Sequence, residues 1–175
     1  MSFSVHVAET IGPIADSVSI EMTPADQAWD WCARWEQMLR EFGDLTAPRT
    51  CGMSAEEIRA GRHHLQRFYV STFHLKDALK KQTGRDVRAA IKTNPELALL
   101  ADLANSAKHD GLDPGFTVHS GHEPRVKEVK GASLPGGGWR VVVTIDHNGK
   151  DLDGIEVAQA GIDAWRRVLT GWKLL

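Results

Sequence analysis

The spacing of the apolar residues changes along this 175-residue chain, and that change does most to limit its fold. Up to about residue 109, apolar residues recur at intervals of three and four, which is the spacing of one face of an α-helix. From about residue 115 they alternate, as in a half-buried β-strand, and after residue 153 the helical spacing returns. We therefore expect an α+β fold: a helical bundle with a small antiparallel β-sheet inserted before the C-terminal helix.

Start and stop signals divide the helical part. Thr23 followed by a proline is expected to open the first helix, and Gly43 is expected to end it. Ser54, with an acid three residues later, forms a capping box for a long second helix, and Gly84 is its expected stop. The expected helices span 23–42, 54–82, 85–93 and 95–109.

The alternating part predicts strands over 116–120, 125–130 and 139–152, with a tight turn at Asn148 and Gly149. Asp153, followed by an acid three residues later, is expected to open the last helix. We expect a single domain over 1–175. Its parts are an N-terminal arm or short strands (1–22), a helical part (23–110), a β-hairpin region (115–152) and a C-terminal helix (153–175).

Composition places the chain among ordinary globular proteins, with 42% hydrophobic and 25% charged residues. No apolar run approaches the roughly 20 residues that span a bilayer, and the first residues lack the basic start of a signal peptide. Cys32 and Cys51 do not form a disulfide framework. We expect a cytoplasmic protein without membrane association and without a cofactor.

Charge is distributed unevenly although the net charge is only −2. Residues 1–48 carry 2 basic and 8 acidic side chains, whereas residues 49–92 carry 10 basic and 4 acidic ones. The basic segment could face phosphates. It could equally pair with the acidic first segment or form a solvated helix face.

The stretch LADLANSAKHDG, residues 100–111, gathers polar side chains at the end of an expected helix. Asp102, Asn105 and His109 lie at spacings of three, four and seven, so they share one helix face, and Lys108 is adjacent. This arrangement fits a reaction site. It also fits a solvated helix terminus, where a late histidine is favoured by the helix dipole.

A second group lies in RFYVSTFHLKDALKK, residues 67–81. Arg67, His74 and Asp77 share a helix face, and Asp77 could orient the His74 imidazole and raise its basicity. The alternative is a surface ladder of ion pairs. If this helix packs antiparallel to 95–109, His74 and His109 could approach each other.

The stretch HSGHE, residues 119–123, contains His119, His122 and Glu123; the pair has tolerable spacing for a metal site, but there is no third partner in a convincing register. Metal sites usually need three or four convergent ligands. We therefore assign no metal site from the sequence.

The two helical stretches resemble a group of uncharacterised bacterial and phage proteins that are similar to the HEPN superfamily. The resemblance rests on FxxSxFHLxDxLK and NPELxLxxDLANSxKH, and covers roughly residues 60–175. It implies homodimers or toxin–antitoxin partners. It also implies metal-independent RNA cleavage, in which a histidine moves protons and an arginine stabilises the phosphorane. His109 matches that histidine and Asn105 the polar residue of the pattern, but Ala104 stands where the arginine should be.

Three functions follow as expectations. The first is a noncatalytic HEPN-like module that works through binding or dimerisation, with RNA and a second copy of the chain as partners. The second is a metal-independent ribonuclease of toxin or defence type that uses His109 or His74. The third is a structural or interaction protein of phage or bacterial origin.

Overall fold

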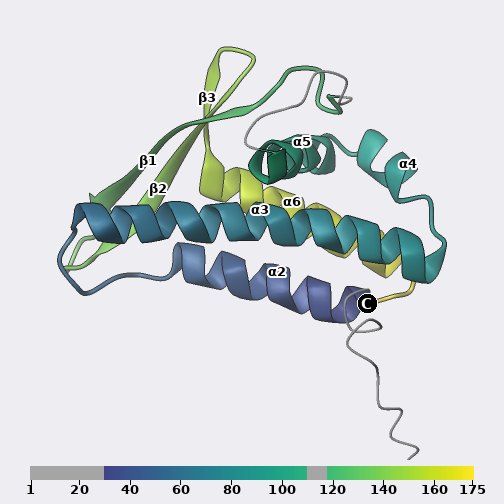
Figure 1. The fold of residues 1–175 in the computed structure, drawn as a ribbon, viewed down its shortest axis with the longest axis horizontal. Helices are drawn as coiled ribbons and strands as arrows, with labels where there is room; N and C mark the ends of the chain where they lie inside the picture. Colours follow the sequence, from purple (N-terminus) through teal and green to yellow (C-terminus); the bar gives the residue numbers. More distant parts are fainter. Residues whose placement is uncertain (1–29, 110–117) are drawn as a thin grey trace, which may run out of the picture.

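The computed structural model describes residues 30–109 and 118–175, and this part has the expected α+β architecture (Figure 1). Helices α2 to α5 come first, a three-stranded antiparallel sheet follows, and α6 ends the chain. The N-terminal arm, the expected helix start at Thr23 and the first two residues of the 116–120 strand lie outside the described residues.

Helix α2 spans Trp31–Thr46, and its N-cap Asp30 accepts a hydrogen bond from the Cys32 backbone N–H at 2.9 Å. The expectation that Gly43 ends this helix is wrong. The helix continues through Gly43, whose φ is not positive, and the Ala47 N–H closes the last turn on the Gly43 carbonyl at 2.9 Å. A glycine stops a helix where the backbone turns left-handed, and here it does not.

Helix α3, Ala55–Thr83, begins and ends as the sequence predicts. The Ser54 hydroxyl accepts from the Glu57 N–H at 3.2 Å, and Gly84 has a φ of 64°, the left-handed conformation of a helix stop. The short helix α4, Val87–Lys92, and helix α5, Pro95–His109, also occupy the expected positions.

The sheet consists of β1 (Arg125–Ser133), β2 (Trp139–His147) and β3 (Lys150–Asp153), with β2 in the centre. Residues 118–120, expected to be part of a strand, are not in one. The buried side chains of β2 alternate along the strand, as the sequence pattern predicts. At Gly61 on α3, an added Cβ would lie 2.6 Å from a methyl of Val141, so this glycine permits the close approach of α3 to β2.

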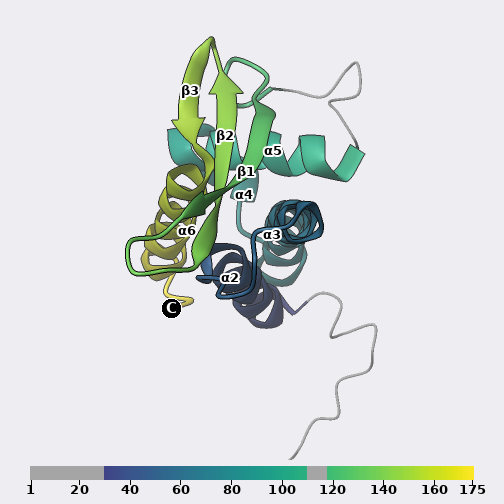
Figure 2. The same ribbon diagram turned by 90° about the vertical axis from the view of Figure 1, so that its left-hand side faces the viewer.

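Helix α6, Gly154–Gly171, is capped by Asp153, which accepts from two backbone N–H groups. The axes of α2, α3 and α6 run side by side, whereas α5 crosses them, as the two views together show (Figures 1 and 2). One apolar core joins residues of every described helix and of β2. Among the described residues, no helix has the length and apolar character of a membrane span.

Candidate functional site

Asp102 on α5 is fully buried and acts as an anchor for the segment that leads to the sheet. Its carboxylate accepts from the His119 N–H at 2.9 Å and from the N–H and hydroxyl of Ser120 at 2.8 and 2.7 Å. A buried carboxylate is tolerated when donors surround it in this way. The geometry therefore gives Asp102 a structural role: it fixes residues 118–120 against α5. The backbone N–H groups of this segment that a strand would use are bound to Asp102, which explains why the expected strand is absent there.

Asn105, one turn further along α5, is in a different situation. It is 4% exposed and lines a pocket of about 970 Å³ between the C-terminal half of α3, helix α4, helix α5 and residues 118–119. Among the described residues, no side-chain hydrogen bond holds its amide. The amide is therefore in place to bind a ligand in the pocket.

Basic side chains dominate the lining of this pocket, which we call the basic pocket. Two acidic residues also line the pocket. Asp86 is occupied as the N-cap of α4, where it accepts from the Ala89 N–H at 2.9 Å. Asp77 lies 4.0 Å from the Lys76 ammonium. The basic residues of the lining are Lys76, Lys80, Arg85, Arg88 and Lys92.

Lys76 and Arg85 make specific contacts within the described part of the chain. The Lys76 ammonium lies 4.0 Å from the centroid of the Phe73 ring, within the range of a cation–π interaction. Arg85 donates to the carbonyl of Trp172 at 3.5 Å, at the end of the chain. The excess of cations over anions makes the pocket suited to a negatively charged ligand.

The second group predicted from the sequence is split by the fold. Asp77 lines the basic pocket. His74 is exposed on α3 outside the pocket lining, with its ring edge-on to Phe73. Arg67 lies further back along α3 and forms an ion pair with Glu41 of α2 at 2.7 Å. The structure therefore does not bring Arg67 and His74 into the basic pocket.

Lys108 and His109 lie in the last turn of α5 by their backbone. Their side chains are outside the described part of the structure, so the expected approach of His109 to His74 stays a prediction.

The lysines and arginines of the basic pocket are not among the site residues predicted from the sequence. The signal was nevertheless present, because all five belong to the basic segment 49–92. In the structure the residues of this segment have two different roles. Arg67 pairs with Glu41 of the acidic first segment, and the five pocket residues surround an open space.

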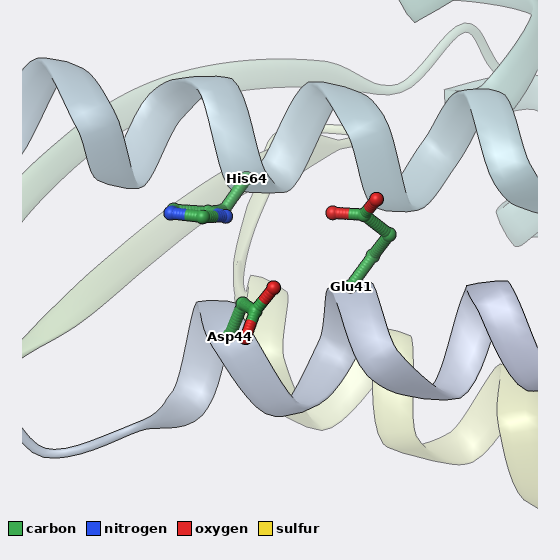
Figure 3. A group of neighbouring side chains, drawn as sticks. All are labelled: Glu41, Asp44 and His64. Carbon is green, nitrogen blue, oxygen red and sulfur yellow. The ribbon is translucent and has the colours of Figure 1, made fainter.

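Within the described ranges 30–109 and 118–175, one group of three side chains has the donors and proximity of a metal site. It consists of Glu41, Asp44 and His64, whose ligand atoms lie within 4.8 Å of one another (Figure 3). This group lies between α2 and α3, and none of its members lines the basic pocket. The histidines of HSGHE do not form such a group with any described residue.

Comparison with known proteins assigns the chain to no family. Neither the protein-family models, nor the curated proteins, nor the solved structures contain a significant match to the chain.

Proposed function

We propose that this chain is a noncatalytic binding module that takes RNA through the basic pocket. The observation that carries the proposal is the set of five basic side chains around one space between α3, α4 and α5. Phosphate contacts from lysine and arginine supply most of the affinity of sequence-independent nucleic-acid binding.

The other lining groups suit a nucleotide. The Phe73 ring is half-buried in the pocket wall and holds the Lys76 ammonium, a cation for a nucleotide phosphate, 4.0 Å from its centroid. The Asn105 amide has both a donor and an acceptor for a base edge or a sugar hydroxyl. A volume of about 970 Å³ is at the upper end of the range of small-ligand sites, so a nucleotide of a longer strand would fit.

The noncatalytic part of the proposal is supported by Ala104. This residue stands where the nuclease pattern has its arginine, and it is 1% exposed within the apolar core. An arginine at this position of α5 would be buried without an evident partner, at a large desolvation cost. The fold at this position is therefore adapted to a small apolar side chain and not to a phosphorane-stabilising cation.

Fluorescence anisotropy with a labelled single-stranded RNA tests the binding. We expect the affinity to fall steeply with salt. The double variant Lys80→Glu, Arg88→Glu should weaken binding by at least about tenfold. The matched control is Arg140→Glu, Lys150→Glu, which makes the same charge change at exposed positions of the sheet and should leave affinity within about twofold. Absence of RNA binding, or equal losses in both variants, would overturn the proposal.

Incubation of the same RNA with the protein in chelator separates a binding module from a ribonuclease. We expect intact RNA. Cleavage by the wild type that is lost in His109→Ala or His74→Ala would instead establish the metal-independent ribonuclease. Intact RNA without any binding would favour the structural or interaction protein.

Assembly as a homodimer belongs to the same proposal and is supported by the HEPN resemblance. Light scattering at micromolar concentration should give twice the chain mass of 19.3 kDa. A monomer mass would remove dimerisation from the proposal and leave RNA binding to stand on the pocket alone.

A further inference from the structure

We propose that Glu41, Asp44 and His64 form a binding site for a zinc ion between α2 and α3. These three residues are called the seam cluster below. One ligand atom of each lies within 4.8 Å of the ligand atoms of the other two. Figure 3 shows both carboxylates and one nitrogen of the imidazole turned toward the same space.

Helix geometry brings the three donors together. Glu41 and Asp44 are three residues apart on α2, so they lie on one face of that helix. His64 is on α3, which packs directly against α2. Two helices therefore supply three ligands across their interface, in the way that metal sites are built between the helices of bundles.

Burial provides the second observation. The Glu41 side chain is 4% exposed, and its Oε1 is bound to Arg67 at 2.7 Å. Its Oε2 is buried and has no hydrogen-bond partner among the described residues. Nδ1 of His64 is likewise buried without a partner in the described part of the chain. A buried acceptor that is left unsatisfied destabilises the fold, and the effect is larger for a charged group. A cation between these two atoms would satisfy both.

The donor set selects the class of metal. An imidazole nitrogen with two carboxylate oxygens suits zinc, which takes such ligands at about 2.0–2.2 Å in tetrahedral geometry. Calcium and magnesium prefer six or more oxygen ligands. Three protein ligands leave the fourth position of zinc to water, and the exposed Asp44 places that position near the surface.

Zinc binding requires only a local adjustment. Ligand atoms around a tetrahedral zinc lie about 3.4 Å apart, and those of the seam cluster lie within 4.8 Å of one another, so small side-chain movements are enough to reach this geometry. Asp44 is exposed and can rotate, while the ion pair with Arg67 holds Glu41 in place. The positive charge of Arg67 opposes the ion, which should keep the affinity moderate.

Calorimetric titration of the full chain with zinc chloride, after treatment with chelator and dialysis, tests the site. We expect one zinc ion per wild-type chain. His64→Gln should weaken zinc binding by at least about tenfold. The matched control is His63→Gln, which removes the neighbouring exposed histidine and should leave the affinity within about twofold. Magnesium chloride should give no binding.

A second variant distinguishes a loss of zinc binding from a loss of folding. Asp44→Asn changes one oxygen at the exposed rim of the cluster, so it should fold like the wild type and also lose at least about tenfold in zinc affinity. Zinc should raise the melting temperature of the wild type and of His63→Gln but not of Asp44→Asn. The proposal is overturned if the wild type binds no zinc, or if His64→Gln and Asp44→Asn bind it as the wild type does.

Discussion

Two regions of α5, one helical turn apart, each bury a polar side chain, and the two side chains differ in what surrounds them. Asp102 has three donors within 2.9 Å, supplied by residues 119 and 120. Asn105 has no side-chain partner among the described residues and borders the basic pocket. Burial alone does not distinguish a structural polar group from one that could bind a ligand, whereas the count of satisfied hydrogen bonds does.

Removal of the anchor should have the largest effect. We expect Asp102→Ala to lower the free energy of unfolding by about 3 kcal/mol, because hydrogen bonds to a charged acceptor contribute more than neutral ones and two backbone N–H groups lose their acceptor. Urea denaturation measures this value. Asp102→Asn keeps one acceptor oxygen and should lose less. If Asp102→Ala were as stable as the wild type, Asp102 would not be an anchor.

Tyr69 on α3 is a buried polar residue that contrasts with Asp102, because its removal should stabilise the fold. It is almost fully buried, and its hydroxyl has no partner among the described residues. We expect Tyr69→Phe to raise the free energy of unfolding at pH 7 by about 1 kcal/mol, because the change removes an unsatisfied polar group and keeps the ring. Urea denaturation at pH 7 checks the sign, and a loss of 1 kcal/mol or more would show that the hydroxyl has a partner.

The pH dependence of the stability difference between the wild type and Tyr69→Phe gives an independent check that the hydroxyl is buried. Burial raises the pKa of Tyr69 far above its ordinary value of 10. Because folding raises the pKa of Tyr69, the stability of the fold does not depend on this ionisation well below pH 10 and falls as the pH rises above that value. Above pH 10 the unfolded tyrosine ionises while the folded one stays neutral, so the wild type should lose stability relative to Tyr69→Phe. Tyr69 is the single tyrosine of the chain, so its absorbance follows this ionisation directly. A stability difference that is constant across pH 10 would contradict the burial of the hydroxyl.

Asn105→Ala should have the smallest effect on stability. We expect a change within about 0.5 kcal/mol, since the amide makes no described hydrogen bond and alanine is the better helix former. RNA affinity measured by anisotropy should fall severalfold under the basic-pocket proposal. A large loss of stability would place Asn105 with Asp102 as a structural residue and end the distinction between the two.

Local signals predicted most of the elements, and the exceptions are the helix stop expected at Gly43 and the strand expected at residues 118–120. The caps at Ser54 and Asp153 and the stop at Gly84 depend on neighbouring residues, so the sequence reveals them. Residues 118–120 alternate like a strand, but their N–H groups bond to a carboxylate 17 and 18 positions earlier. No local pattern reveals such a partner.

The candidate sites follow the same rule. Helical spacing placed Asp102 and Asn105 on one face, yet their different surroundings come from segments remote in sequence. The seam cluster joins residues on two helices, with Glu41 and His64 more than 20 positions apart. Its members carry no motif spacing, and only the packing of α2 on α3 brings them together.

Among the described strands, β1 pairs on one side only, which bears on the behaviour of the folded protein at high concentration. An edge strand presents unpaired backbone groups that can recruit another chain and begin aggregation. Here the pairing register shifts between Val126 and Glu128, and the Lys127 ammonium reaches Asp151 at 2.8 Å. A bulge and exposed charges are the features that discourage further strand addition. The edge of β1 is thus protected against self-association by strand addition.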